Sequence, residues 1–390
     1  ASGHVYAVGT VGSIVGAFGT TFVLIPTLDV ALIGLVFGLL LVVTAAGLVG
    51  RDGALRRQAA VLLVGAVVVA ASGASVAGID VEGRTVYETQ TAYQHLEVVD
   101  RGDVRTLYLD GQTHSAMDLD DPTRHVLDYT RYFHLPSLVA DDPDAIDRVL
   151  FVGGGGFTGP KRFLADDPDV KVDVVELDPA VIDVAQRYFR VEPSERLTIH
   201  RDDGRRFLRE TDHTYDLIVL DAYRKDKVPF HLTTVEFVRL ASDRLDDDGI
   251  LFANLIAAPS GPASAFYRAE YKTIDRVFPR VYSFPTVGGV AVQNVEIVAT
   301  KSDALLTEDE LLERNERRDV GVDLADAIEA YRRNEPTDDV PVLRDDRAPV
   351  DALLDPAAGQ RYVVERADPN ATATDDAGGA GTGTGAASAP

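Results

Sequence analysis

The sequence predicts an α/β protein whose central domain has a Rossmann-like, nucleoside-binding fold. An apolar run at residues 149–152 ends in the four glycines 153–156. Glycines directly after a strand allow a ligand to approach the backbone closely. Glu176 ends the next apolar run, at roughly the 20-residue interval expected when one helix joins the first two strands of such a domain. An acidic residue at this position can bind ribose hydroxyls.

The pattern that follows favours a parallel, doubly wound sheet, because short apolar runs alternate with helical segments. We expect helices at residues 179–189 and 233–245, with Pro179 in a first helical turn. A hairpin at residues 282–300 closes the domain. The predicted strands lie at residues 149–152, 171–176, 197–200, 215–220 and 250–255.

The glycine run does not fit a dinucleotide site well. In a G-x-G-x-x-G frame that begins at Gly153 and Gly155, the last glycine is replaced by Thr158. We therefore favour a mononucleoside ligand, such as a sulfonium adenosine, over NAD.

The first 79 residues are predicted to be a membrane domain of about three transmembrane helices. Residues 5–25, 30–49 and 59–79 are apolar, nearly uncharged and about the 20 residues long that a spanning helix needs. A buried soluble hairpin is the alternative. The chain begins inside this pattern without a methionine, which is consistent with a fragment of a longer membrane domain.

The predicted location is the cell membrane, with a multi-pass anchor, but the orientation is ambiguous. Arg51, Arg56 and Arg57 would place their loop in the cytoplasm and the following domain outside. A sulfonium nucleoside is kept in the cytosol, so the chemistry favours a cytoplasmic catalytic domain. We give the chemistry more weight, because three arginines are a modest bias.

Composition excludes several classes of function. The chain of 390 residues has 46% hydrophobic residues and a formal net charge of −24, so nucleic acid is not an expected partner. The acidic, lysine-poor composition favours a halophilic source, although an ordinary acidic protein would also fit. The absence of cysteine excludes disulfides, thiolate metal sites and cysteine nucleophiles.

The composition also suggests how the rest of the chain is divided. Residues 80–136 are expected to form a small β unit with strands at 93–99 and 105–111, the second of which ends in an Asp-Gly turn. A linking helix is expected to follow at residues 124–134. The catalytic domain would cover residues 137–300. Residues 301–366 would form a helical extension, and residues 367–390, rich in alanine, glycine and threonine, a disordered tail.

Further acidic residues follow two of the predicted strands, where ligands of such sheets bind. Asp203 could accept a hydrogen bond from an adenine amino group, cap the helix that follows, or do both. Asp221 could take a proton from an attacking amine. Asp178, directly before Pro179, is expected to cap the next helix rather than to contact a ligand.

The motifs, taken in order, resemble those of the spermidine synthases, the polyamine aminopropyltransferases. The resemblance covers roughly residues 87–300 and is similar to the branch in which this domain follows a membrane region. The motifs that carry it are Tyr93-Gln94-His95, Leu107-Tyr108-Leu109-Asp110-Gly111, the glycine run, Val175-Glu176-Leu177-Asp178-Pro179, Asp203-Gly204-Arg205 and Asp221.

The resemblance implies a class I S-adenosylmethionine-dependent transferase fold and a role for each matching residue. Gln94 would contact the cofactor together with Gly153, Gly155 and Gly156. Glu176 would bind the ribose, Asp203 the adenine, and Asp221 would be the catalytic base. The donor would be decarboxylated S-adenosylmethionine and the acceptor a small-molecule amine. Tyr93, His114 and Arg224 would lie at the acceptor side.

Three departures from the family pattern bear on the reaction. Gly156 stands where the family has the aspartate that attracts the ammonium of the decarboxylated donor and repels the carboxylate of S-adenosylmethionine. Arg131 replaces the glutamate of a Tyr-His-Glu motif, and Arg224 replaces the second aspartate of D-x-x-D, with Lys225 beside it. His114 stands at a glutamine position. Cations in the acceptor site would repel a polyamine, unless they are surface charges outside it.

Two alternative functions therefore remain open. The first is methyl transfer from S-adenosylmethionine to another nucleophile. The second is a non-catalytic membrane protein that binds a nucleoside. No metal site is expected, because the histidines lack paired spacing. The bilayer is an expected partner, and the sequence leaves homo-oligomerisation open.

Overall fold

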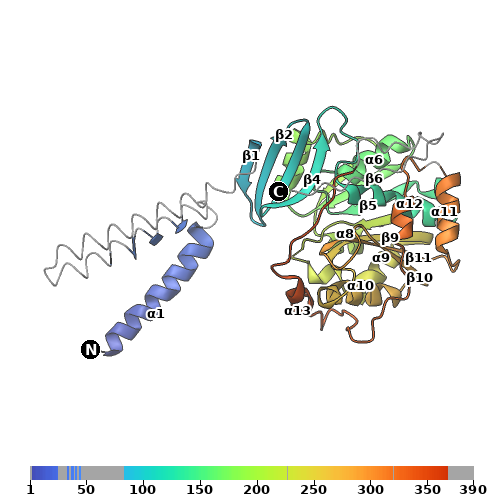
Figure 1. Cartoon of the computed structure of the whole chain (residues 1–390). Coiled ribbons are helices and arrows are strands. Elements are labelled where there is room, and N and C mark those ends of the chain that lie inside the picture. Colours follow the sequence, from blue (N-terminus) through green and yellow to red (C-terminus); the bar gives the residue numbers. More distant parts are fainter. Residues whose placement is uncertain are drawn as a thin grey trace, which may run out of the picture. The chain divides into compact units, whose positions relative to one another are not determined.

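The computed structural model describes residues 2–24, 33–34, 37–38, 40–41, 44, 83–225, 227–318 and 320–367. The chain divides into two compact units, Ala1–Val99 and Asp100–Pro390 (Figure 1). The predicted boundaries of the β unit, the catalytic domain and the extension stay predictions. The predicted disordered tail lies outside the described residues, apart from Ala367.

In the first unit, helix α1 (Ser2–Gly19) is followed by a π-helical turn, η1 (Thr20–Leu24). Strand β1 (Arg84–Gln90) follows, and β2 (His95–Arg101) begins in this unit. Thr85 donates a hydrogen bond of 2.9 Å from its hydroxyl to Glu97, which links the two strands.

The prediction of transmembrane helices is not supported by the described residues. None of their helices is both long enough and apolar enough to cross a membrane. The α-helix that overlaps the first predicted span, α1, contains glycines and polar residues that lower its hydropathy. Most of the second predicted span and all of the third lie outside the described residues, and the membrane location stays a prediction.

The second unit contains a seven-stranded sheet of order β10-β11-β9-β8-β5-β6-β7. Strands β5 to β9 run parallel to one another, whereas β10 and β11 form a hairpin at one edge, in which β11 pairs antiparallel with β9. This confirms the predicted Rossmann-like sheet and its closing hairpin. The strands are β5 (Arg148–Val152), β6 (Lys171–Glu176), β7 (Leu197–Arg201), β8 (Tyr215–Leu220), β9 (Leu245–Ala257), β10 (Arg280–Pro285) and β11 (Gln293–Thr300).

Ahead of this sheet, β3 (Val104–Leu109) and β4 (Gln112–Asp118) form an antiparallel hairpin. Asp110 and Gly111 both have positive φ, 50° and 75°, as a tight two-residue hairpin turn requires. The predicted Asp-Gly turn is thus confirmed. The helix expected at residues 124–134 is instead the 3₁₀ helix η2 (Asp128–His134), which leads into α5 (Leu135–Val139).

Helices connect the strands and cover the sheet (Figure 1). Three helices begin at a residue whose side chain caps the first turn. Asp178 accepts a hydrogen bond from Ala180 N, Asp203 from Arg206 N and Thr234 from Phe237 N. The main helices are α6 (Thr158–Asp166), α7 (Pro179–Tyr188), α8 (Gly204–Glu210), α9 (Val235–Asp243), α10 (Ala265–Asp275), α11 (Glu308–Arg317), α12 (Ala325–Glu329) and α13 (Val350–Leu354).

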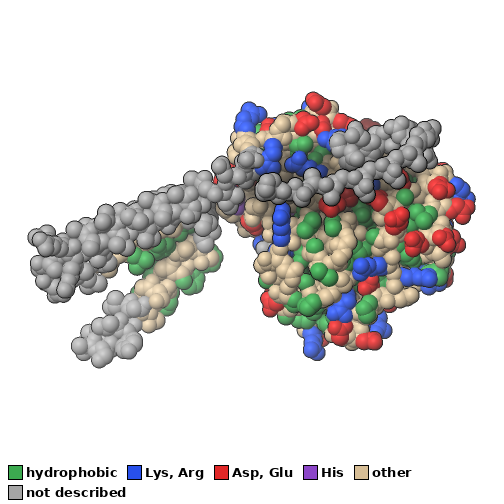
Figure 2. Space-filling view, viewed as in Figure 1, with side chains coloured by type: hydrophobic (Ala, Val, Ile, Leu, Met, Phe, Trp, Pro, Cys, Tyr) green, Lys and Arg blue, Asp and Glu red, His purple; other side chains and the backbone are tan. Residues whose placement is uncertain are grey.

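Arginines attach the C-terminal extension to the sheet domain. The Arg314 guanidinium donates hydrogen bonds to the carbonyls of Leu138, Val139 and Ala140, at 2.9 to 3.1 Å. Arg318 donates to the same turn, which joins α11 to the end of α5. Acidic and basic side chains are interspersed over the visible face of the second unit (Figure 2).

The strand order changes direction at β5. From β5 the chain moves outward to β6 and β7, and then returns to the other side of β5 for β8 and β9. The connections that leave the carboxyl ends of β5 and β8 therefore diverge, and ligands of open α/β sheets bind at such a point. This edge carries the glycine run, Glu176 and Asp221.

Loss of the cap of α7 gives a direct test of this fold. Asp178→Ala should lower the free energy of unfolding by about 1 kcal/mol, because the orphan amide of Ala180 loses its acceptor. Urea denaturation of this variant and of Asp183→Ala measures the difference. Asp183 is exposed on the same helix, and its ion pair with Arg187 is 3.6 Å long. Equal midpoints for the two variants would contradict the capping role.

Candidate active site

The first glycine of the run is required by backbone contact. Gly153 has φ +101°, and a Cβ at this position would lie 2.4 Å from the carbonyl oxygen of Asp221. Its amide donates to Val175 O at 2.9 Å, and the Asp221 amide donates to Val152 O at 2.9 Å. The carboxyl ends of β5, β6 and β8 are therefore held together by main-chain contacts that leave no room for a side chain.

Glu176 binds the glycine loop directly. One carboxylate oxygen accepts the amide of Gly154 at 2.9 Å, and the other accepts the amide of Asp178 at 2.9 Å. Burial raises the pKa of Glu176, although these backbone hydrogen bonds oppose the shift. Each oxygen keeps a second lone pair, so the carboxylate can still accept from ribose hydroxyls.

Gly156 is enclosed by its neighbours. Its amide donates to the Ser115 hydroxyl at 2.9 Å, and a Cβ here would lie 2.7 Å from Ser115 Cβ and 3.2 Å from Phe189 Cδ1. The next residue, Phe157, is fully buried in a left-handed conformation with φ 58° and begins α6. The site of the family's aspartate is thus occupied by packing around Ser115 and Phe189.

His114 lies on β4 beside the glycine loop. Its ring carbon Cδ2 would be 3.1 Å from a Cβ on Gly155, and its carbonyl accepts from Tyr129 Oη at 3.2 Å. Burial first, and then the charge of Arg224, lower the pKa of His114 to about 4. The imidazole is therefore neutral near pH 7.

Asp221 stands at the end of β8, where the proposed base is expected. Part of the residue is exposed, but the atoms packed around its carboxyl raise its pKa to about 7, with a further contribution from Glu176. Asn254 donates to its Oδ1 at 2.8 Å and opposes this shift. A carboxylate with this pKa can take up a proton at neutral pH.

Behind Asp221 a chain of side-chain hydrogen bonds crosses the sheet. Asn294 Nδ2 donates to Asn254 Oδ1 at 2.7 Å, and Tyr362 Oη donates to Asn294 Oδ1 at 2.6 Å. Tyr362 belongs to the C-terminal extension, where Val363 N bonds to Val292 O at 2.9 Å. The extension therefore contributes a side chain to the surroundings of Asp221.

Asp203 is held by the protein at both carboxylate oxygens. Oδ1 accepts from Arg206 N at 2.9 Å, and Oδ2 accepts from His231 Nε2 at 2.8 Å. Burial would raise the pKa of Asp203, but these two hydrogen bonds outweigh it and lower the pKa. The predicted cap is confirmed, and the predicted adenine contact stays a prediction compatible with it.

The two arginines that depart from the family pattern are paired with carboxylates. Arg131 bonds to Asp128 at 2.7 Å and to Asp326 at 2.8 Å, so its charge is neutralised by η2 and the C-terminal extension. Arg224 bonds to Asp110 at 2.7 Å. Lys225 bonds instead to the carbonyl of Gln360 in the extension.

Two predicted residues belong to the first unit. Tyr93 and Gln94 lie in the turn between β1 and β2, where their amides bond to the Thr91 hydroxyl at 3.0 and 3.1 Å. The predicted contacts of both residues with ligands stay predictions. Of the other predicted residues, Gly153, Gly155, Gly156, Glu176, Asp203 and Asp221 lie together at the strand ends with His114 beside the glycines. Arg224 bonds to Asp110.

Four residues near Asp221 were not among the predicted site residues: Asn254, Asn294, Glu296 and Tyr362. A signal for three of them was available, because Asn254, Asn294 and Glu296 interrupt otherwise apolar strands. Fully buried strands rarely carry polar side chains without a partner or a function. For Tyr362 the sequence held no such signal.

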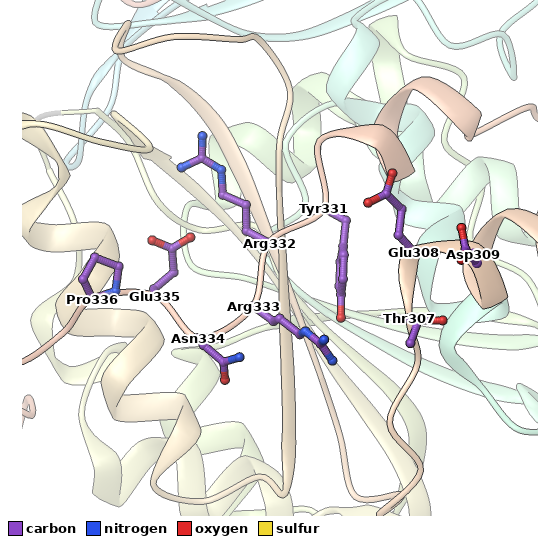
Figure 3. A pocket seen from close by; sticks show the side chains of 9 residues that line it. All are labelled: Thr307, Glu308, Asp309, Tyr331, Arg332, Arg333, Asn334, Glu335 and Pro336. Carbon is purple, nitrogen blue, oxygen red and sulfur yellow. The ribbon is translucent and has the colours of Figure 1, made fainter.

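A separate cavity of about 660 Å³ lies between the start of α11 and the segment after α12 (Figure 3). In this view the Tyr331 ring lies between Glu308 and Arg333. None of the predicted site residues line it. The residues that line the cavity are Thr307, Glu308, Asp309, Tyr331, Arg332, Arg333, Asn334, Glu335 and Pro336.

Within the described part of the chain, no group of three or more His, Asp and Glu side chains is placed to hold a metal ion.

Comparison with known proteins identifies the family. The profile of the spermine/spermidine synthase domain matches residues 132–274. A polyamine aminopropyltransferase of Vibrio vulnificus is 30% identical over 207 residues, 51% of this chain and 67% of the relative. One of Thermococcus kodakarensis is 30% identical over 255 residues, 61% of this chain and 83% of the relative.

The chain belongs to the spermidine synthase family. It is a spermidine synthase-like transferase, as its motifs predicted. A solved structure of a probable spermidine synthase from Corynebacterium glutamicum shares the fold, with a TM-score of 0.52 and 20% identity over 59% of this chain and 86% of that one. The family resemblance and the enzyme class are thereby confirmed.

The packing at Gly156 predicts what restoring the family's aspartate would do. Gly156→Asp should lower the free energy of unfolding by about 1–3 kcal/mol, because its Cβ overlaps Ser115 and its carboxylate enters a buried site. Thermal denaturation measures this effect. Gly288→Asp is the matched control, since Gly288 has no atom within 4 Å of its Cβ position. A Gly156→Asp variant as stable as the control would show that the loop can rearrange.

Proposed function

We propose that this protein transfers an aminopropyl group from decarboxylated S-adenosylmethionine to a small-molecule amine. The observation that carries the proposal is Asp221, a carboxylate with a pKa of about 7 beside a glycine loop at the switch point of the sheet. Its chemistry is that of a base, which matches the residue and the position implied by the family resemblance.

The transfer needs alignment and one proton acceptor. The amine nitrogen attacks the carbon next to the sulfonium, and the bond between that carbon and sulfur breaks. Its electron pair goes to sulfur, and methylthioadenosine leaves. The acceptor binds as an ammonium, and Asp221 takes one proton from it so that the nitrogen has a free lone pair. The product keeps the other two protons as a secondary ammonium. The sulfonium supplies the driving force, so the protein needs to place the reactants and accept the proton.

The nucleoside side of the site supports this donor class. Gly153 keeps the loop backbone open, and Glu176 is held by the loop amides with lone pairs left for ribose hydroxyls. In the proposal Asp203, fixed by its own helix and by His231, accepts from the adenine amino group. The donor is proposed to bind without a metal ion.

Methyl transfer from S-adenosylmethionine is a second candidate, favoured by one observation. No carboxylate stands at Gly156 to repel the carboxylate of the ordinary cofactor. Turnover with each donor and a shared set of amines separates the two reactions, since one releases methylthioadenosine and the other S-adenosylhomocysteine. Release of S-adenosylhomocysteine alone would contradict aminopropyl transfer.

The role of Asp221 predicts a pH profile. The ionised carboxylate is the active form, so kcat/KM should rise about tenfold per pH unit at acid pH and level off above a pH of about 7. Asp221→Asn should lower kcat by about 10²–10⁴-fold and leave the affinity for the donor unchanged. Initial rates and calorimetry measure these effects.

The same variant should fold at least as well as the wild type. Because the pKa of Asp221 is raised from 3.8 to about 7 in the folded protein, its ionisation costs stability as pH rises between these values. Asparagine removes that cost, so the melting temperature of Asp221→Asn at pH 8 should equal or exceed the wild-type value. If the variant keeps full turnover, or if neither protein turns over any amine, the catalytic role is wrong.

A further inference from the structure

In the sequence, arginines replace the acidic residues with which the family motifs would hold an amine acceptor. The structure places a different carboxylate, Glu296, near Asp221. Glu296 on β11 is 0% exposed, and neither of its carboxylate oxygens has a hydrogen-bond partner among the described residues. A buried carboxylate without a partner is costly, because the protein replaces none of the water it loses.

The strand register places Glu296 on the same face as the side chains around Asp221. Glu296 is the cross-strand partner of Asn254, whose amide bonds to the Asp221 carboxylate. Such partners project to the same side of a sheet, as does Asn294 two residues earlier. The chain of hydrogen bonds from Asp221 to Tyr362 therefore runs on the face of the sheet that carries Glu296.

The charges around Glu296 are acidic or phenolic. Burial raises the pKa of Glu296 well above its usual range, and the charge of Asp221 raises it further. Glu296 in turn raises the pKa of Tyr129, Tyr132 and Tyr362, which also lie within its electrostatic range. Among the cations that depart from the family pattern, Arg131 is already bonded to Asp128 and Asp326.

We propose that Glu296 binds the second, non-reacting ammonium group of a diamine acceptor whose first amine is deprotonated by Asp221. One strand, β9, separates β11 from β8, so the two backbones are about 10 Å apart. Two carboxylates that reach inward from such positions suit a flexible dication with several carbons between its charges. This inference rests on the function proposed above, and it supplies an acceptor carboxylate from a position outside the family motifs.

Binding of the diamine can be tested without turnover. With methylthioadenosine filling the nucleoside site, calorimetry gives the Kd of 1,4-diaminobutane and of butylamine for the wild type and for Glu296→Gln. We expect Glu296→Gln to weaken the diamine by about 10- to 100-fold and to leave butylamine unchanged, because only the diamine has an ammonium to lose its partner.

Glu270→Gln is the matched control. Glu270, on α10, is also 0% exposed with unpartnered oxygens among the described residues, and its pKa is raised well above the usual range. The ionisable group that acts on it is Tyr223 rather than Asp221. Glu270→Gln therefore removes a buried ionisable carboxyl, as Glu296→Gln does, but it should leave the affinity for both amines unchanged.

Proton release gives a second readout that a purely structural role would not produce. Burial favours the protonated form of the Glu296 carboxyl, whereas a bound ammonium would favour its ionised form. Diamine binding to the wild type should therefore release up to one proton more than binding to Glu296→Gln. Calorimetry in two buffers with different ionisation enthalpies measures the difference.

The outcomes separate this inference from the function on which it rests. Equal weakening of both amines by Glu296→Gln, equal proton release, or no diamine binding to the wild type would overturn the role of Glu296. If the diamine binds with the expected selectivity but the wild type releases no methylthioadenosine from the decarboxylated donor, the proposed reaction fails and the binding role stands.

Discussion

The close approach of β5 and β8 at the carboxyl edge of the sheet is the contact on which the candidate site depends. Gly153 lies against the backbone of Asp221, and the amide of Asp221 bonds to Val152. This main-chain contact fixes the base relative to the loop that would carry the nucleoside. Since no side chain takes part in it, the distance between the Asp221 backbone and the loop does not depend on a rotamer.

The site combines carboxyl groups whose surroundings separate their pKa values. Asp203 is stabilised as an anion by its helix amide and His231, whereas burial raises the pKa of Asp221 to about 7 and that of Glu296 well above its usual range. Differences of this kind allow similar groups to serve in recognition, proton transfer and cation binding. The cost is stability, because the buried acids oppose folding as pH rises above their ordinary pKa values.

The sequence predicted the sheet and most of the strand-end residues because both depend on local patterns. Apolar runs of four to six residues mark β5 to β8, and the carboxylates that follow them necessarily reach the same edge. Glu296 and Tyr362 could not be placed in this way. Glu296 approaches Asp221 only through pairing of β11 with β9, and Tyr362 returns from the C-terminal extension, so both depend on long-range contacts.

The substituted cations show why residue type alone misjudged the acceptor side. Arg131 and Arg224 suggested a basic site, but a guanidinium acts on a ligand only to the extent that its charge is not already bonded. In the structure Asp128, Asp326 and Asp110 bond to those two arginines. The charge next to Asp221 then depends on Glu296, a buried carboxyl whose oxygens have no hydrogen-bond partner among the described residues. A carboxylate on β11 can thus offset the loss of acidic residues from the motifs, provided that a cation enters to bind it.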